Sequence, residues 1–464
     1  MATQQNYNTA KQNVRNLRVK IDLLNFNFQT VDAIEGNVIS GSINIDANSD
    51  IRRTCDISLV VTDASFNVTE GGKIWMDKYI QIYTGIDDIR TGETDWINQG
   101  IYIINAPSLQ FDAVTDTLSF QGLDLMAKLT GARNGFMDDI TTTITTGSSI
   151  RTVMIETLQN FTQFTRFAIE DNPQKTPYDM VFEVGSTVYD ILSQLRDITP
   201  NYEIFFDVDG TFVYQKIPSG ENDPVIADND LWDDILISES TDVNFDEVKN
   251  RIIVLGRAHD PDHFGSATLV GSEYQVTIAT IGVLETDMII GFTTTAIATN
   301  PTLKINALAA KPLVNEDGTP AVLPDAEAFY IVRVLANGNF LYMGRQQIRA
   351  EASDTNPNSP YYINGSIGEI LLPLYGGEYD NIVTDDLAGQ RARYELWLRT
   401  RMNDSINLTC VPAYFLDVNQ KISYARIGTT TPLEYLMKSI SFDLSESGTM
   451  SIECIRFYAE YPDI

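Results

Sequence analysis

The sequence predicts a mainly β fold in which two barrel-like domains flank a small α+β module. Between Lys73 and Gly131, apolar residues recur at every second position, the period of half-buried antiparallel strands. Residues 136–240 instead contain two stretches with helical periodicity, and strand-like alternation returns from residue 241. This β, α+β, β order indicates several domains, as expected for a chain of 464 residues.

The first expected domain spans residues 18–135, after an N-terminal arm at residues 1–17. Strand-like runs cover residues 17–28, 37–46 and 55–61, with Glu35-Gly36 and Asn48-Ser49-Asp50 as turns. The meander between Lys73 and Phe120 adds further short strands, and a short helix-like segment at residues 123–129 is expected to end it. About seven short strands without a long helix predict a barrel or sandwich.

The second expected domain is the α+β module at residues 136–240. Ser148 or Ser149 can cap a helix with an apolar stripe through residues 150–161, and Ser186 can cap a second helix before Pro200. A hairpin follows over residues 201–217, with Asp209-Gly210 as its turn.

The third expected domain covers residues 241–464 and is the second barrel-like domain. Strands are expected at 249–256, 272–280, 328–336, 340–352, 405–415, 435–445 and 450–461. A late helix is predicted at residues 385–402, with Leu387, Tyr394, Leu398 and Met402 on one face.

The formal net charge of −31 excludes nucleic-acid binding by counterion release, which requires clustered Lys and Arg. The charge fits either a solvated surface or a surface that lies close to a polyanion without holding it. No run is long and apolar enough to span a bilayer, and residues 1–20 contain no secretion signal, so we expect folding in a cytoplasm. Cys55, Cys410 and Cys454 are expected to be buried thiols, because no CxxC spacing occurs.

One motif points to phosphatase chemistry. Residues 205–211, FFDVDGT, match the haloacid-dehalogenase pattern, in which Asp207 would be the nucleophile and Asp209 a general acid. That chemistry needs a helix directly after the motif. Residues 212–215 alternate as a strand instead, which favours a simple hairpin.

Other catalytic and metal-binding patterns are weak. His259 and His263, the only histidines, flank Asp260 and Asp262 in HDPDH and could share a metal on a helix, but Pro261 favours a loop. No Walker A loop, GxGxxG, GxSxG or HExxH occurs. We therefore expect no enzyme activity, no cofactor and no metal.

The late helix carries a concentration of arginines in an acidic chain. Its members are Arg391, Arg393, Arg399 and Arg401. They either form a solvated face or dock against acidic regions of a neighbouring copy, because Arg pairs well with interfacial carboxylates.

Several strings resemble the baseplate and tail-hub proteins of tailed bacteriophages. These are residues 51–60, IRRTCDISLV; 75–88, WMDKYIQIYTGIDD; 100–131; 387–410, LAGQRARYELWLRTRMNDSINLTC; and 435–453, YLMKSISFDLSESGTMSIE. The C-terminal pattern is shared more loosely with late-control proteins and the hubs of contractile phages. The best match is an uncharacterised branch from phages of Gram-positive and gut bacteria.

This resemblance implies a structural virion protein that forms a homotrimeric ring in the phage tail, assembled in the host bacterial cytoplasm. The ring would adapt a sixfold tail tube or distal tail protein to a threefold spike, fibre or other tip protein, and could contact a tape measure protein. Genomic DNA would pass an acidic lumen during ejection into the host cell without specific binding. The alternative is a receptor- or carbohydrate-binding tail-tip protein, with aromatics such as Tyr361, Tyr362 and residues 375–379 exposed on loops.

Overall fold

The computed structural model is mainly β, which confirms the predicted fold class. It describes residues 3–457 except 35, 62–67, 112–115, 138–140, 178, 200, 243–244, 259–260 and 401–404. The chain forms two compact units, the first comprising Met1–Phe245 with Arg401–Tyr461 and the second Asp246–Thr400. The longest described helix has 15 residues, and no described helix combines the length and hydropathy of a membrane span.

The first unit is organised on one long sheet that combines strands from both ends of the chain. Its order is β14-β25-β28-β27-β3-β4-β7-β6-β5-β1-β2, and β26 pairs with both β27 and β13. The bounds are β1 Leu17–Leu24, β2 Thr30–Ile34, β3 Gly36–Asp46, β4 Arg53–Val61, β5 Tyr79–Asp87, β6 Thr94–Phe111, β7 Asp116–Asp124, β13 Val225–Ala227, β14 Leu236–Asp242, β25 Ser405–Cys410, β26 Lys421–Tyr424, β27 Leu433–Asp443 and β28 Met450–Arg456.

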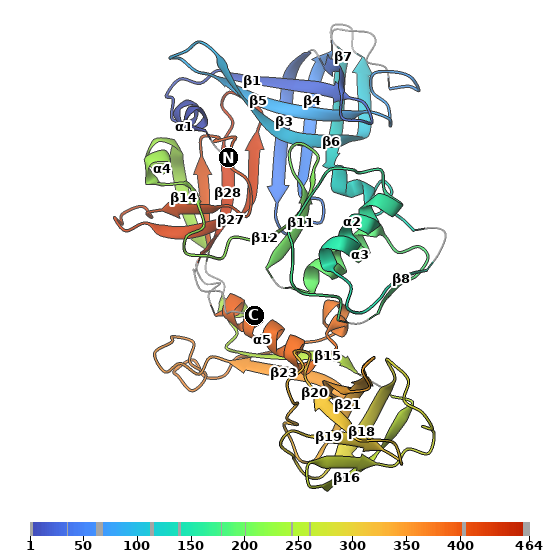
Figure 1. Ribbon diagram of the computed structural model, residues 1–464. Helices are drawn as coiled ribbons and strands as arrows, with labels where there is room; N and C mark the ends of the chain where they lie inside the picture. The colour runs from blue at the N-terminus through green and yellow to red at the C-terminus, as the bar shows by residue number, and fades with distance from the viewer. Residues whose placement is uncertain are drawn as a thin grey trace. The chain divides into compact units, whose positions relative to one another are not determined.

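The junction between the two ends of the chain is the antiparallel pair β27–β3. Ile440 lies opposite Ile45 and Phe442 opposite Ile43, and all four side chains are buried in one core. In Figure 1 the red C-terminal strands accordingly lie beside blue β3. The expected domain 241–464 is therefore divided: residues 405–456 extend the N-terminal sheet, and the preceding residues form a separate unit.

The N-terminal segment is docked onto the first unit. Helix α1 (Gln4–Ala10) begins at Thr3, which forms a capping box with Asn6. Asn6 and Thr9 donate hydrogen bonds to the buried Asp95 carboxylate, and the Tyr7 hydroxyl donates to the Ile226 carbonyl at 2.9 Å. The segment expected as an arm is thus a packed helix.

The α+β module lies within the first unit and shares one apolar core with sheet residues such as Leu24, Tyr79 and Ile103. It contains α2 Ile150–Phe161, α3 Val188–Asp197, β8 Thr142–Ile144, β9 Phe167–Ile169, β10 Met180–Phe182, β11 Tyr202–Phe206 and β12 Phe212–Lys216, and it follows η1 Leu125–Lys128. Ser149 caps α2, as one of the two predicted candidates. Thr187, rather than the predicted Ser186, caps α3, because its side chain and Asp190 form a capping box. Helix α4 (Asn229–Ile235) follows the module.

The second unit contains a closed barrel and a three-stranded sheet. The barrel order is β16-β17-β19-β20-β22-β21-β18, and the sheet order is β23-β15-β24. The bounds are β15 Arg251–Ala258, β16 His263–Val270, β17 Glu273–Val276, β18 Ile289–Thr294, β19 Thr302–Ile305, β20 Lys311–Val314, β21 Ala328–Val334, β22 Phe340–Arg345, β23 Gln347–Ser353, β24 Leu371–Leu374, η2 Phe245–Glu247, η3 Gly377–Asn381 and α5 Asp385–Arg399.

Helix α5 packs against β15 and β23 through a different face from the one predicted. Its buried residues are Ala388, Ala392 and Glu395, whereas Leu387 and Leu398 are only half-buried. Small alanines allow the helix backbone to approach the sheet closely, which an apolar stripe of larger residues would prevent.

Candidate functional site: a polar face of the long sheet

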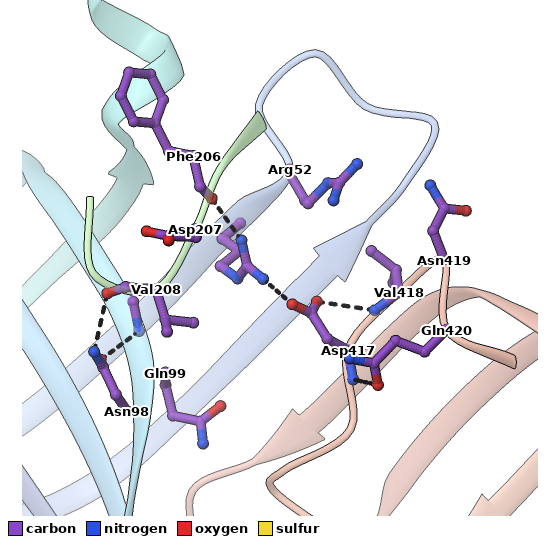
Figure 2. Close-up of polar contacts among 12 residues, drawn as sticks. Arg52, Asn98, Gln99, Phe206, Asp207, Val208, Asp417, Val418, Asn419 and Gln420 are labelled. Atoms are coloured by element: carbon purple, nitrogen blue, oxygen red, sulfur yellow. Dashed lines mark hydrogen bonds and ion pairs between the residues drawn. The ribbon is translucent and has the colours of Figure 1, made fainter. Parts of the chain in front are cut away.

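The phosphatase-like motif is a hairpin turn that packs within the first unit. Strands β11 and β12 pair with Phe206 opposite Phe212, so no helix follows the motif. The Asp207 carboxylate accepts hydrogen bonds from the backbone N–H groups of Asp209 and Thr211 at 3.0 and 2.8 Å, which makes it an Asx-type turn residue. Asn98 of β6 donates to the Val208 carbonyl at 3.0 Å (Figure 2). Both aspartates therefore have roles in holding the turn.

Beside this turn, a buried arginine joins three separate parts of the sequence. Arg53 on β4 is 2% exposed; its guanidinium donates to the Phe206 carbonyl at 2.8 Å and pairs with Asp417. Its backbone N–H donates to Asp124 at 2.9 Å. Asp417 in turn accepts from the backbone N–H of Val418 at 2.8 Å. This contact fixes the module and the C-terminal strands to β4.

A second buried network lies around Arg52. Its guanidinium pairs with Glu203 and stacks on the Phe205 ring, with Cζ 3.8 Å from the ring centroid. Asn419 donates to Glu203 and accepts from the Lys438 amine at 2.8 Å. Burial lowers the pKa of Lys438 to about 8, against the raising effect of Glu203.

The HDPDH segment, which the sequence predicts to be a loop rather than a metal site, is only partly described. His259 and Asp260 lie outside the described residues, and His263 begins β16 with its Nδ1 2.8 Å from the Thr280 hydroxyl. Within the described parts of the chain, no group of three His, Cys, Asp or Glu side chains could hold a metal ion.

The arginines of α5 differ in their surroundings. Arg391 and Arg399 both pair with the buried Glu395 of the same helix, and Arg391 also pairs with Glu378. Arg393 is exposed, and Arg401 lies outside the described residues. Arg391 and Arg399 therefore neutralise an acid within their own unit. Of the three α5 arginines that the structure describes, Arg393 is the one exposed to a partner.

The aromatic residues named for receptor binding are also not equivalent. Tyr375 is 69% exposed, while the Tyr379 ring lies under Arg391, with 5.2 Å between Cζ and the ring centroid. Tyr361 and Tyr362 are half-buried. These residues do not form one exposed aromatic cluster.

One face of the long sheet forms an organised polar surface, which was not predicted from the sequence. We call it the polar face. Val60 and Ile455 also lie on this side, in rows with Thr117 and Ser405, but the face is defined by the polar outward residues of β14, β25, β28, β27, β3, β4, β7 and β6. They are Ser238, Ser240, Ser405, Asn407, Thr409, Ser451, Glu453, Ser439, Ser441, Asp443, Ser40, Ser42, Asn44, Asp46, Thr54, Asp56, Ser58, Thr117, Ser119, Gln121, Ser108 and Gln110.

The register aligns these residues into transverse rows. One row runs Ser238, Thr409, Ser451, Ser441, Asn44, Thr54, and another runs Ser40, Ser58, Ser119, Ser108. The Ser58 and Ser119 hydroxyls are 2.9 Å apart. Residues that alternate with them, such as Ile43 and Ile57, are buried in the core. The alternation leaves a hydroxyl-rich outer surface on strands from both ends of the chain.

The charge on the polar face has one sign. Its charged members are Asp46, Asp56, Asp443 and Glu453, and none of the defining residues is Lys or Arg. The amine of Lys438 lies at a bulge beside the face, where it donates to Asn419. A surface of neutral hydroxyls and carboxylates offers hydrogen bonds to water and repels a polyanion.

The α+β module marks where the polar face ends. The row that contains Thr54 continues across the sheet through Leu123, Ile103, Tyr79 and Leu24. These four residues pack against the core of the module. The same sheet face is thus apolar where the module covers it and polar where it is open.

The middle of the polar face is hollowed. A depression of about 600 Å³ is lined by small side chains, among them Gly41, Ser42, Ser58, Ser108 and Ser119. Ala106, at a β-bulge between Asn105 and Ser108, adopts a left-handed φ of 46° at its edge. Alternating serines in strings such as SGSINID and SISFD were a visible signal, but only the strand order shows that they form one surface.

Comparisons with known proteins agree with a tail-protein fold. A family model described as a domain of unknown function, DUF5048, matches residues 358–461, and no curated protein matches the sequence. The 43 kDa tail protein of prophage MuSo2 from Shewanella oneidensis is similar in structure, with a TM-score of 0.54 and 11% identity over 94% of this chain and 98% of that one. A tail protein from Neisseria meningitidis has a TM-score of 0.52 and 9% identity, over 94% and 96% of the two chains. This chain shares the fold of these solved tail proteins.

Proposed function

We propose that this protein is a structural subunit of a phage tail, and that three copies form a hub ring whose inner wall is the polar face. The observation that carries the proposal is that most outward side chains across eight neighbouring strands are hydroxyls, amides or carboxylates, and that none of the residues defining the polar face is Lys or Arg. The shared fold with solved tail proteins supports the same role.

The position of the polar face on the sheet supports a ring wall. Strands β3, β4, β7 and β6 come from the N-terminal part of the chain, whereas β25, β28 and β27 come from its end. Both groups present the same chemistry to one side. In a trimer, the two groups would supply six similar wall segments, which would match a sixfold tube, while the three chains would match a threefold tip.

Electrostatics explains why such a wall would suit passing DNA. Phosphates attract clustered Lys and Arg strongly, so basic residues would retain the duplex. Carboxylates at Asp56, Asp443 and Glu453 would repel phosphates within a Debye length of about 8 Å at physiological salt. Serine hydroxyls would hold a water layer without adding charge. Such a wall favours transit over binding.

The proposed partners are those that a hub ring of this kind would contact. The ring would contact a tail tube or distal tail protein on one face and a spike, fibre or other tip protein on the opposite face, with a possible contact to a tape measure protein. The protein would reside in the virion tail after assembly in the host cytoplasm, and DNA would pass without sequence-specific contacts.

The first test is the mass of the purified protein in solution. Native mass spectrometry should show a particle of three chains of 51.8 kDa each. A chain that stays monomeric at every concentration, even in the presence of tail-tube protein, would contradict the hub proposal.

A further inference from the structure

A second hollow in the first unit has a chemistry unlike that of the polar face. It has a volume of about 420 Å³ and lies between the turn after β1 and the end of α2. Its aromatic lining is formed by Phe26, Phe28, Tyr79, Phe161 and Phe164. This volume is within the roughly 300–1,000 Å³ that is typical of small-ligand sites.

This pocket is lined by Lys128, which pairs with no carboxylate in the part of the chain that the structure describes. The Lys128 amine lies 5.1 and 4.7 Å from the ring centroids of Phe26 and Tyr79 and donates a hydrogen bond to the Tyr79 hydroxyl. No carboxylate among the described residues pairs with it. Burial lowers its pKa, and Arg133 lowers it further. In a chain of net charge −31, an unneutralised cation in a cavity is suited to an anionic ligand.

The rim of the pocket carries unused hydrogen-bonding groups. The amides of Asn134, Asn160 and Gln163 line it, and their side chains make no hydrogen bond to other described residues. Phe161 is 43% exposed, and within the described chain neither a ring nor a cation stacks on it. An open aromatic face can pack against the apolar face of a sugar ring, and side-chain amides can both donate to and accept from its hydroxyls.

The aromatic wall is held rigidly. Phe28 has a left-handed φ of 58°, which is unfavourable for a residue with a side chain. The side chain of Asn25 compensates, because its oxygen accepts from the backbone N–H groups of Asn27 and Gln29 at 2.9 and 3.1 Å. The Phe28 ring then packs 5.3 Å from Tyr79, centroid to centroid. A rigid wall reduces the entropy that a ligand must overcome.

We propose that this pocket binds a saccharide unit that carries a carboxylate or a phosphate. The sugar ring lies on Phe161, its hydroxyls bond to the rim amides, and the anionic group pairs with Lys128. An apolar peptide side chain would leave both the amides and the lysine without partners, so the observations favour the anionic saccharide. This inference is independent of the proposed hub role and goes beyond it.

Isothermal titration calorimetry on the full-length protein tests this proposal with three probes. These are a galacturonate trimer, mannose 6-phosphate and neutral maltotriose. We expect one or both anionic probes to bind at least tenfold more tightly than maltotriose, with weaker binding at high salt. The comparison of carboxylate with phosphate identifies which anion the pocket takes.

Matched variants locate the binding. Lys128→Met and Phe161→Ala should each weaken binding of the anionic probe at least tenfold, whereas Lys175→Met and Phe111→Ala, which replace exposed residues elsewhere in the first unit, should leave it unchanged. Circular-dichroism melting curves verify that each variant folds. No binding of any probe, equal binding of maltotriose, or full binding by folded Lys128→Met would overturn the proposal.

Discussion

The Arg53 guanidinium is ion-paired with Asp417, 364 positions later in the sequence. Arg53 also donates to the Phe206 carbonyl, so one side chain connects β4, the α+β module and the segment before β26. A cation that is 2% exposed requires such a partner, because an unpaired buried charge is strongly destabilising.

Removal of Asp417 should therefore destabilise the first unit. We expect Asp417→Ala to lower the free energy of unfolding by about 3 kcal/mol, because Arg53 would stay buried without its carboxylate. Urea denaturation followed by fluorescence measures the change. The control is Asp325→Ala, which removes the partner of the more exposed Arg345 and should cost less than about 1 kcal/mol. Equal losses of unfolding free energy in the two variants would contradict the structural role of the Arg53–Asp417 ion pair.

The stability should depend on pH through Lys438. Its pKa of about 8 in the folded protein is below the ordinary value of 10.5, so the unfolded chain binds more protons between these values. Stability from this residue is therefore gained as pH rises from about 8 towards 10.5. In denaturation curves at pH 7 and 9.5, the wild type should gain stability relative to Lys438→Met. If the difference in unfolding free energy between the two proteins is the same at both pH values, the pKa of the Lys438 amine is not lowered in the folded protein.

Substitution of the α5 arginines should affect stability to different extents, because Arg391 is ion-paired within its unit and Arg393 is exposed. Arg391→Glu would place a third acid beside Glu395 and Glu378, and should cost about 3 kcal/mol or more in the stability of the second unit. Arg393→Glu should change stability by less than about 0.5 kcal/mol, because that side chain is exposed. If Arg393→Glu also leaves the oligomer mass unchanged in native mass spectrometry, α5 is not a docking surface between copies.

Basic residues placed on the polar face should make the assembled protein hold DNA. The variant Ser58→Lys/Ser441→Lys should bind a short duplex at 50 mM salt, and each phosphate contact should add about 0.9 to the salt slope. The variant Ser272→Lys/Thr295→Lys has the same net charge, with both lysines at exposed positions of the second unit. Filter binding should give at least tenfold tighter binding for the polar-face variant. Equal DNA affinities of the two variants would argue against the proposal that the polar face lies beside passing DNA.

Local features of the fold were predictable from sequence. The hairpin Tyr202–Lys216 follows from alternation around Asp209-Gly210, and the α2 and α3 helices follow from their apolar stripes. Three buried cysteines are confirmed as free thiols. Each of these features depends on residues that are close in sequence.

Long-range features were not predictable in the same way. Nothing near Ile440 indicates that it lies opposite Ile45, because strand pairing leaves no local pattern. The packing face of α5 was misjudged because Ala388 and Ala392, rather than larger apolar residues, contact the sheet. The polar face depends on the same pairing: Ser42 and Ser441 belong to alternating strings, but only register places them on one surface.

The most direct test of the central claim is an electron cryomicroscopy reconstruction of the purified assembly. The account predicts a threefold ring whose bore is lined by the polar face, with Asp56, Ser58 and Ser441 directed into it. A ring in which these residues face outward, or in which basic side chains line the bore, would contradict it.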